Sequence, residues 1–497
     1  MAEVQPTWSR LERRLDRWFP PGRNPLLHLG SLACLMLALV LLSGIYLFIV
    51  FDTSAAGAYR SIESLAREQP LAGGWLRSLH RYAADAMFLF TIAHLAREWA
   101  LGRYRHFRRV TWWTGIPLLL FLYLGGIGGF WLNWDQLGQY SALASAELID
   151  ALPFLGAGLS RQFIGVAAVS DRLFSLLIFV HIGVALLLVF GLWFHLQRLG
   201  WPAVLPPRRL TIGSLAMLGL LALLQPVLSQ VPADLAHAPT TLAFDWILLH
   251  LHPLAEALTP GWVWLLLLIA FVILVLLPWR GGNAAPVAAV VDPDHCNGCR
   301  RCTVDCPFGA ISLTLHPNGK AGQQLAVVDA ERCASCGICA GACPTSTPFR
   351  RDQRLTAGID MPQLPVDALR QRVRAALDAL PDMHKVLVFG CDQGADLAAM
   401  RSSGAAGISL LCAGQLPPSF IEFALRAGAS GVVVAPCGEG ACAYRLGNRW
   451  TVERLAGARE PHLRASVAAD RYRVVHASRG DEAQLTAVID AGISRSE

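Results

Sequence analysis

Residues 77–97 read RSLHRYAADAMFLFTIAHLAR, an apolar stretch in which His80 and His94 stand fourteen residues apart. The same interval separates His181 from His195 in a second apolar stretch. Fourteen residues are close to four helical turns, so both histidines of a pair lie on one helix face, roughly 21 Å apart along the axis. Two such helices can hold two haems, one between His80 and His181 and the other between His94 and His195. Two imidazoles on each iron leave no open axial position, which favours electron transfer over oxygen chemistry.

The interval of fourteen recurs twice in glycines, between Gly30 and Gly44 and between Gly115 and Gly129. A porphyrin lying between helices needs a neighbouring backbone without a Cβ atom, and glycine provides this. Glycine is also an ordinary packing residue of membrane helices, so either pair alone permits that explanation. Intramembrane histidines in register with both pairs favour the two-haem interpretation over buried structural histidines.

The resemblance to a known family rests on residues 77–85, 111–115 (TWWTG) and 134–138 (WDQLG), and on the helix with the second histidine pair. These stretches resemble the cytochrome b family of quinol:cytochrome c and plastoquinol complexes, closely over about 25–205 and weakly over 206–280. The resemblance implies a dihaem membrane domain over residues 1–280 and, because the family is dimeric, a homodimer. It also implies that Arg77 and Arg81 pair with propionates of the haem at His80, and that Arg97 serves the other haem.

Composition agrees with a membrane protein that has a soluble part. The chain has 497 residues, of which 54% are hydrophobic, and its apolar runs of about twenty residues are long enough to span a bilayer. Six spans are predicted, at about 26–51, 76–98, 112–131, 173–196, 211–231 and 261–279. An all-α bundle of about six helices is therefore expected. The net charge of +6 is accounted for by arginine-rich loops, so it gives no reason to expect a nucleic-acid partner.

Arginines predict the topology of these spans. They cluster before the first span and after the second and fourth, whereas the connection between the fifth and sixth spans has neither Lys nor Arg. The positive-inside rule then places both termini in the cytoplasm and the chain in the cytoplasmic (inner) membrane. His94 and His195 lie near the cytoplasmic face in this arrangement, and His80 and His181 near the outer face.

Two stretches are candidates for a quinone site. Residues 239–246 (PTTLAFDW) look like a degraded form of the family's Pro-Glu-Trp-Tyr segment, whose carboxylate accepts a quinol proton. Asp245 is thus either a quinone-site base or an interfacial carboxylate. Residues 132–172 correspond to the part of the family that covers an outer-face quinone pocket, but a polar surface loop would look the same.

A glycine-rich stretch within residues 281–291 reads as a linker, and the composition changes completely after it. Residues 292–350 contain C-x2-C-x2-C-x3-C-P twice, which is the run of bacterial two-cluster ferredoxins. The fourth cysteine of each run binds the other cluster. One [4Fe–4S] set is therefore Cys296, Cys299, Cys302 and Cys343, and the second is Cys333, Cys336, Cys339 and Cys306. Zinc sites rarely use this doubled run, and a cytoplasmic location disfavours disulfides.

Residues 351–382 are expected to form a connector with a helix over 366–380. Beyond it, residues 383–497 alternate strand-like and helix-like runs, which predicts a small α/β domain with a parallel sheet. Cys391, Cys412 and Cys437 each follow a predicted strand, at the sheet edge where α/β proteins place their sites. With Cys442 they form a set that can hold a [2Fe–2S] cluster, although the spacing also permits zinc or a redox disulfide.

This last domain carries a second resemblance, on residues 391–396 (CDQGAD), 411–414 (LCAG), 426–432 (RAGASGV) and the C-x4-C-A-Y run from Cys437. It resembles the delta subunit of methyl-viologen-reducing hydrogenase. The resemblance implies a [2Fe–2S] cluster and exchange of electrons with a flavin subunit related to heterodisulfide reductase. The family often has a further cysteine three residues before the first, where this chain has Val388, so its ligand set departs from the family's pattern.

Together the domains suggest a membrane electron-transfer subunit of an oxidoreductase. It would link a cytoplasmic flavoprotein or dehydrogenase, through one [2Fe–2S] and two [4Fe–4S] clusters, to two b haems and the quinone pool. The haems are expected to be of b type because no C-x-x-C-H run is present. One alternative is a quinol-oxidising module that drives electrons to a low-potential cytoplasmic acceptor. Another is a redox sensor or anchor without quinone turnover.

Overall fold

The computed structural model describes residues 4–20, 22–152, 158, 169–237, 241–280, 287–317, 323–350, 354–381, 384–400, 402, 404–438 and 440–491. The chain divides into two compact units. The first comprises Met1–Trp18, Arg23–Gln197 and Pro202–Gly281, and the second comprises Phe19–Gly22, Arg198–Trp201 and Gly282–Glu497. Residues 281–286 of the predicted linker, part of the 132–172 connection and residues 239–240 lie outside the described residues, whereas the end of the linker forms β1 (Val290–Val291).

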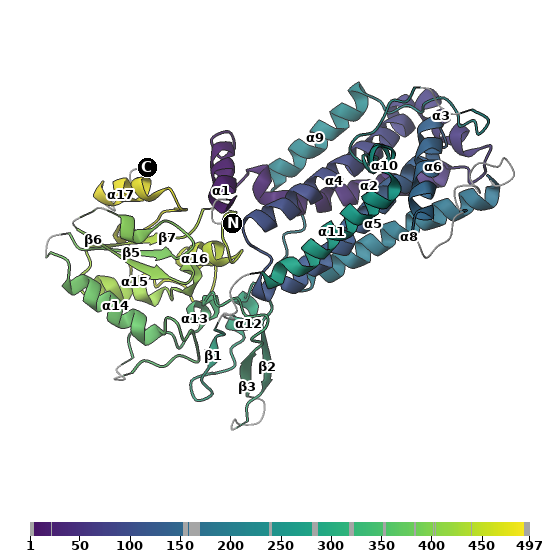
Figure 1. The fold of residues 1–497 in the computed structure, drawn as a ribbon. Coiled ribbons are helices and arrows are strands. Elements are labelled where there is room, and N and C mark those ends of the chain that lie inside the picture. The colour runs from purple at the N-terminus through teal and green to yellow at the C-terminus, as the bar shows by residue number, and fades with distance from the viewer. Residues whose placement is uncertain are drawn as a thin grey trace. The chain divides into compact units, whose positions relative to one another are not determined.

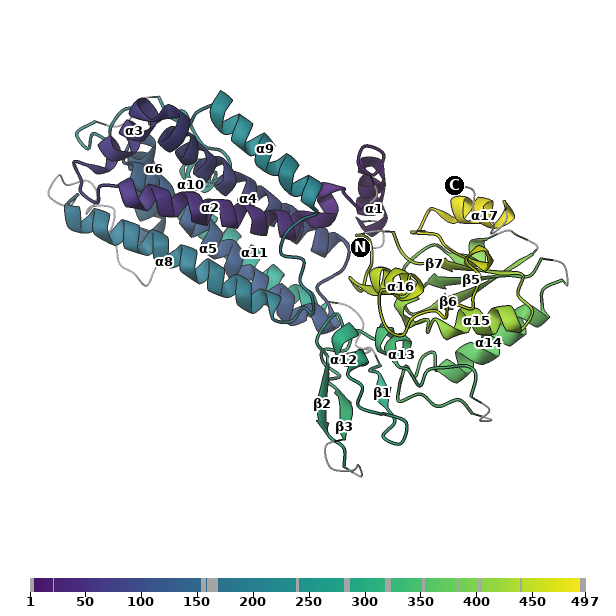
Figure 2. The ribbon, with the colours of Figure 1, turned by 180° about the vertical axis from the view of Figure 1, so that it is seen from behind.

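The first unit is helical (Figures 1 and 2). Its helices are α1 (Val4–Leu15), α2 (Leu29–Val50), α3 (Ala58–Glu68), α4 (Trp75–Ala100), α5 (Arg109–Asn133), α6 (Gln136–Asp150), α8 (Asp171–Leu196), α9 (Arg208–Leu224), α10 (Leu251–Leu258) and α11 (Pro260–Leu276). Helix α2 packs on α4, α5 packs on α8, and α9 packs on α4. Apolar side chains from these helices meet in a common core that includes Met36, Ala83, Leu122, Leu188 and Leu218.

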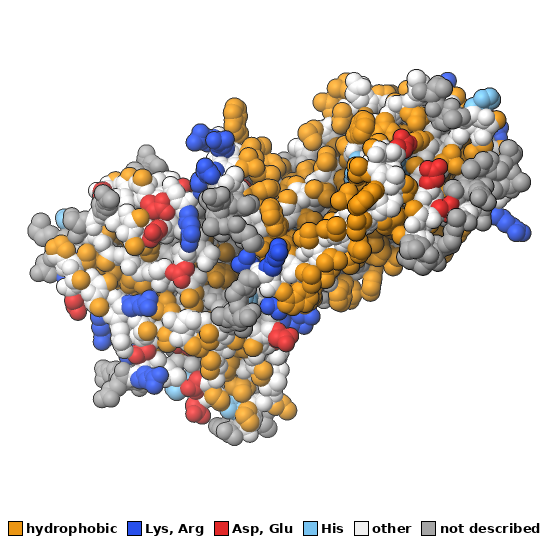
Figure 3. All heavy atoms as spheres, in the orientation of Figure 1, with side chains coloured by type: hydrophobic (Ala, Val, Ile, Leu, Met, Phe, Trp, Pro, Cys, Tyr) orange, Lys and Arg blue, Asp and Glu red, His pale blue; other side chains and the backbone are white. Residues whose placement is uncertain are grey.

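Large apolar side chains also cover the outside of this bundle. Figure 3 shows hydrophobic side chains covering the visible flank of the helices. On α8, Phe179 and Phe190 are 73% and 63% exposed, and Leu268 on α11 is 57% exposed. A bundle with large apolar side chains on its surface requires a lipid environment. The first unit therefore belongs to a multi-pass membrane protein.

Among the described residues, four of the six predicted spans correspond to helices long and apolar enough to cross a membrane: Pro25–Val50, His106–Asn133, Asp171–Leu196 and Pro260–Trp279. The other two predicted spans also form helices, but they differ in character. Helix α4 has 26 residues and carries several charged side chains, which pack inside the unit. Helix α9 has only 17 residues and ends just before Pro226. Both pack against apolar neighbours, so the bundle has six long helices in the part of the chain that the structure describes.

The WDQLG stretch forms a tight corner between α5 and α6. Trp134 adopts a left-handed conformation with φ of +48°, and the Asp135 carboxylate then accepts a hydrogen bond from the Gly138 backbone N–H at 2.9 Å, which caps α6. A Cβ atom on Gly138 would lie 2.5 Å from the Phe130 carbonyl oxygen. Only glycine fits there. Asp135 is therefore a buried structural residue and not part of a polar surface loop.

The second unit contains two small antiparallel pairs and one parallel sheet. Strand β1 (Val290–Val291) pairs with β4 (Ile359–Asp360), and β2 (Ile311–Leu315) pairs with β3 (Gln324–Val328). Short helices α12 (Arg301–Asp305) and α13 (Ile338–Ala342) lie within the cysteine runs. The parallel sheet has the order β6-β5-β7-β8, with the strands β5 (Val386–Cys391), β6 (Ala405–Leu410), β7 (Gly431–Ala435) and β8 (Tyr472–Val474).

Helices cover both faces of this sheet (Figure 1). On one face, Leu387 and Phe389 pack with residues of α14 (Val366–Asp378) and α15 (Ser419–Arg426). On the other face, Val388 and Val433 pack with α17 (Glu482–Asp490), and α16 (Gly447–Leu455) lies beside the cysteine loops. The expected fold class is confirmed. Helix α14 lies in the segment predicted to be a connector, but its apolar side chains make it a layer of the α/β fold.

Candidate redox cofactor sites

The two histidine pairs lie inside the helical bundle, one pair on α4 and the other on α8. The structure brings together the partners predicted to share an iron. His80 interacts electrostatically with His181, and His195 interacts with His94. Two neutral imidazoles from facing helices are the ligands that a six-coordinate b haem requires. The residues present therefore fit the group.

Hydroxyl groups fix one histidine of each pair. The Ser43 Oγ lies 3.0 Å from His80 Nδ1, and the Thr114 Oγ1 lies 2.9 Å from His195 Nδ1. Each hydroxyl donates its own hydrogen to a backbone carbonyl of the preceding helical turn. The hydroxyl oxygen is then the acceptor for Nδ1–H, which leaves Nε2 bare for a metal. Sequence reasoning missed Ser43 and Thr114, although each directly precedes one of the fourteen-spaced glycines.

On α2, both predicted glycines face an imidazole ring. A Cβ atom on Gly44 would stand 3.1 Å from the His80 ring, and one on Gly30 would stand 3.3 Å from the His94 ring. Both distances are tighter than normal van der Waals contact, so a larger residue would push the ring aside. These glycines therefore leave room for the histidine itself.

On α5, the predicted glycines are less crowded. Cβ atoms on Gly115 and Gly129 would stand 3.5 Å from the His195 and His181 rings, which is ordinary contact. All four glycines thus lie beside a histidine, as the shared interval predicts. The pairs differ in how closely the ring approaches.

This difference predicts unequal effects of alanine. Gly44→Ala is expected to displace the His80 ring and to weaken retention of its haem by roughly tenfold, the size of effect seen when a ligand's support is lost. Gly129→Ala, next to His181, is the matched control and should leave haem content near that of the parent. Haem bound per chain after detergent dilution measures this. Equal losses in both variants would mean that the glycines serve the porphyrin and not the ring.

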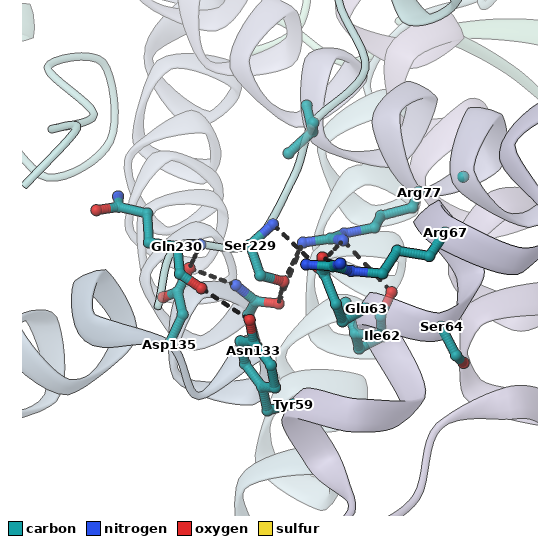
Figure 4. Close-up of polar contacts among 12 residues, drawn as sticks. Tyr59, Ile62, Glu63, Ser64, Arg67, Arg77, Asn133, Asp135, Ser229 and Gln230 are labelled. Atoms are coloured by element: carbon teal, nitrogen blue, oxygen red, sulfur yellow. Dashed lines mark hydrogen bonds and ion pairs between the residues drawn. The ribbon is translucent and has the colours of Figure 1, made fainter. Parts of the chain in front are cut away.

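Arg77, expected to pair with a haem propionate, lies in a buried polar network at one end of α4 (Figure 4). Its guanidinium donates to Ser229 Oγ at 2.7 Å, to Asn133 Oδ1 at 3.3 Å, and to Glu63 Oε2 at 3.5 Å. It also donates to the Ile62 carbonyl oxygen at 3.3 Å. Protein groups thus surround Arg77, so its observed role is to tie α3, α5 and the segment after α9 to α4.

Arg97 lies near the other end of α4, where it pairs with Glu12 of α1 at 2.7 Å and with Glu98 at 3.5 Å. Its Nη2 atom is buried and has no hydrogen-bond partner among the described residues. A buried guanidinium nitrogen without a partner is costly, so this atom fits an anionic group such as a propionate.

Arg81 contacts Asp245, the candidate quinone-site residue. It forms ion pairs with both Asp85 and Asp245, and its guanidinium lies 4.5 Å from the centre of the Phe130 ring. The other oxygen of Asp245 accepts a hydrogen bond from the Leu248 backbone N–H at 2.7 Å. Asp245 is therefore held by partners on both oxygens, and one of them is the residue after His80.

The first eight cysteines of the second unit line two hollows. One is lined by Cys296, Cys299, Cys302 and Cys343. The other is lined by Cys306, Cys333, Cys336 and Cys339. We call these the first and second ferredoxin sites. The grouping is the crossed one that the sequence predicts, and four thiolates around one hollow fit a [4Fe–4S] cluster.

The two ferredoxin sites differ in exposure. Cys336 and Cys339 are buried, and burial raises the pKa of both thiols above their ordinary range. Thiols in such surroundings ionise only next to a cation, which an iron centre supplies. In the first site Cys299 is exposed.

Air is therefore expected to destroy the cluster of the first site before that of the second. Iron and paramagnetic resonance signals, followed during timed exposure to air, measure the order. A Cys333→Ala/Cys339→Ala chain, which keeps only the first site, identifies which signal belongs to it. Loss of the second signal first would contradict the assignment.

The last four cysteines meet at the carboxyl edge of the parallel sheet, and all are buried. Cys391 ends β5, while Cys412 and Cys437 each lie two residues beyond β6 and β7. Hydrogen bonds from the Cys412 and Cys437 thiols lower the pKa of Cys391, and a hydrogen bond from Cys412 lowers the pKa of Cys442. We call this the C-terminal cysteine site, and its four converging sulfurs fit a small iron–sulfur cluster.

A glycine on α16 makes room for these sulfurs. A Cβ atom on Gly447 would lie 2.1 Å from Cys412 Sγ and 3.7 Å from Cys442 Sγ. Any other residue at this position would displace Cys412. No local pattern reveals this requirement, because Gly447 is distant in the chain from β5 and β6.

Comparison with known proteins finds three family models along the chain. Residues 15–200 match cytochrome b/b6/petB, residues 295–347 match the 4Fe-4S dicluster domain, and residues 386–495 match the delta subunit of methyl-viologen-reducing hydrogenase. Cytochrome b6 of Synechococcus sp. (strain CC9605) is 28% identical over 167 residues, which are 31% of this chain and 76% of that protein. Cytochrome b6 of Prochlorothrix hollandica is 29% identical over 170 residues, or 33% and 76% of the two chains.

Among solved structures, a chain of a hyperthermophilic respiratory Complex III is similar, with 20% identity and a TM-score of 0.41 over 50% of this chain and 74% of that one. The family matches define the class: a membrane-bound electron-transfer protein. More particularly, three parts of the chain match, in order, cytochrome b, the 4Fe-4S dicluster domain and the delta subunit of methyl-viologen-reducing hydrogenase.

Proposed function

We propose that this chain carries electrons between a cytoplasmic flavoprotein or dehydrogenase and membrane quinone. It is an electron-transfer subunit of a quinone-linked redox complex. The partner would dock on the C-terminal α/β domain, as the likeness to the hydrogenase delta subunit suggests. One-electron transfer is the chemistry that haem and iron–sulfur clusters supply when bound.

One observation carries this proposal: cysteine and histidine sets suited to five one-electron groups lie in a single chain. His80 with His181 and His94 with His195 would hold two haems. Each ferredoxin site would hold a [4Fe–4S] cluster, and the C-terminal cysteine site a [2Fe–2S] cluster. The buried thiols among these ligands exclude water, which keeps their groups from reacting with solvent or oxygen.

The arginine distribution supports an orientation with the iron–sulfur domains in the cytoplasm. His94 and His195 would then be the pair nearer to them. Electron movement between the two histidine pairs would cross the bilayer, with about 2.3 kcal/mol per charge gained or required for each 100 mV.

Single-turnover oxidation tests the link to quinone. The full holoprotein is reduced with dithionite without oxygen, freed of excess reductant, and mixed with decylubiquinone or a menaquinone analogue. The haem spectrum is expected to return to the oxidised form as the quinone is consumed. Haems that stay reduced beside unchanged quinone would instead indicate a sensor or anchor.

The reverse direction is the second candidate, and the setting of Asp245 favours it. A carboxylate near the outer haem could serve as a quinol base, and Asp245 pairs with Arg81, the residue next to His80. Mixing the oxidised protein with decylubiquinol distinguishes the two directions. Rapid haem reduction by quinol under an applied membrane potential would support a quinol-oxidising module.

A further inference from the structure

A buried ion-pair cluster joins the dicluster domain to the α/β domain within the second unit. Asp305 ends α12 immediately before Cys306, and its side chain is 3% exposed. Arg454 of α16, 1% exposed, donates to Asp305 Oδ2 at 2.5 Å. Arg459 donates to Asp305 Oδ1 at 2.6 Å. We call Asp305, Arg454 and Arg459 the clasp.

The clasp also holds both cysteine loops by their backbones. Arg454 donates to the Gly414 carbonyl oxygen at 2.8 Å and to the Ile338 carbonyl oxygen at 3.3 Å. Gly414 follows Cys412 of the C-terminal site, while Ile338 lies between two cysteines of the second ferredoxin site. One guanidinium thus fixes a loop from each domain.

Glycines let these two loops approach closely. A Cβ atom on Gly341 would lie 2.1 Å from the Gly414 carbonyl oxygen. Gly337, with φ of +75°, would place a Cβ atom 2.8 Å from the Gln415 side chain. Larger residues at either position would force the loops apart.

As a result, the two cysteine sites share one buried cluster. Cys336 and Cys412 pack together with Ile338, Leu446 and Trp450. The Cys336 thiol also interacts electrostatically with Cys442. By contrast, among the described residues this buried cluster contains no cysteine of the first ferredoxin site.

We propose that the second ferredoxin site is the one that exchanges electrons with the C-terminal cysteine site, and that the clasp positions the two sites for it. The first ferredoxin site then exchanges electrons with the second ferredoxin site, and not directly with the C-terminal cysteine site. This inference rests on the proposed function for its redox groups. A single electron passes between the two sites and no atom moves, so one site is oxidised as the other is reduced.

Burial of the clasp explains why it would hold the two cysteine loops in one arrangement. A buried ion pair adds little net stability to the folded state. Removing one of its partners, however, leaves an unpaired buried charge and is strongly destabilising. Asp305 has two arginine partners, and Arg459 also stacks 3.3 Å over the Trp450 ring. The ion pairs thus define one arrangement of the loops and disfavour others.

The test is electron paramagnetic relaxation in the full reduced holoprotein. A paramagnetic neighbour speeds the relaxation of the C-terminal cluster, which appears as a higher half-saturation power. In a Cys333→Ala/Cys339→Ala chain, which lacks the second site, this power is expected to fall because the neighbouring paramagnetic centre is gone. A Cys296→Ala/Cys299→Ala chain, which lacks the first site, should keep the parent value.

The clasp is tested by Asp305→Asn/Arg454→Met, which removes both charges together and avoids leaving one unpaired. Its iron content should equal that of the parent while the half-saturation power falls. Arg426→Met on α15 is the control, since Arg426 is 63% exposed and pairs with Glu422, which pairs with no clasp residue in the described part of the chain. The single variant Arg454→Lys keeps the positive charge, so it should retain part of the half-saturation power that the double variant loses.

Relaxation that depends on the first site, or that is unchanged without the second, would overturn the inference. If the clasp variant loses iron, the two cysteine pairs still decide which site is the neighbour. The failure of the proposed function has a different signature. Quinone would not oxidise the haems, even though the relaxation pattern held.

Discussion

Replacing His94 with alanine is expected to halve the haem content, from about two to about one per chain, because each b haem needs both of its axial imidazoles. His195→Ala should give the same single-haem protein, since these histidines face each other across α4 and α8. His80→Ala and His181→Ala should give the other single-haem protein, with a different midpoint potential. Pyridine haemochrome assays and redox titration measure both outcomes.

His237→Ala is the control for these variants. Its side chain is 80% exposed and pairs with Asp234, away from both histidine pairs, so two haems should remain. Four variants that each lose both haems, or spectra that pair His80 with His94, would contradict the assignment. A variant that retains one haem is folded, which separates ligand loss from failure to fold.

Asp245→Asn is expected to slow electron exchange with quinone by roughly 10²–10⁴-fold while both haems stay bound, because an amide cannot accept a proton. The change is nearly isosteric, and the amide oxygen can still accept the hydrogen bond from the Leu248 N–H. Arg81 retains Asp85 as a partner. The rate of haem oxidation or reduction after mixing with quinone or quinol measures the effect.

Asp234→Asn, in the same connection between α9 and α10 and about half exposed, serves as the matched control. If Asp245 is only the counter-ion of Arg81, its replacement will shift the potential of the haem at His80 and leave the quinone rate intact. That result would remove Asp245 from proton transfer.

Several features of this molecule could be predicted because they depend on local repetition. Fourteen-residue spacing on a helix sets which face a side chain occupies, so the positions of His80, His94 and the four glycines follow from the sequence alone. The doubled cysteine runs are likewise local patterns, and their spacing predicts which four cysteines share each cluster. Cys391 and its partners could be placed at the sheet edge because parallel strands end at a common edge.

Contacts between distant segments could not be predicted. The network around Arg77 has no local signal, because Glu63 and Ser229 come from segments that only the tertiary fold brings near. The segment that contains α14 is predicted to be a connector, because an apolar stripe on a helix does not identify the surface against which that helix packs. Asp305 and Arg454 are 149 residues apart, and no local pattern links them.

A potentiometric titration of the purified holoprotein tests the central claim most directly, with haems followed optically and clusters followed by paramagnetic resonance. The account predicts five one-electron centres, with potentials that rise from the iron–sulfur clusters to the haems, as downhill flow into quinone requires. Fewer than five centres, or haem potentials below those of the clusters, would contradict it.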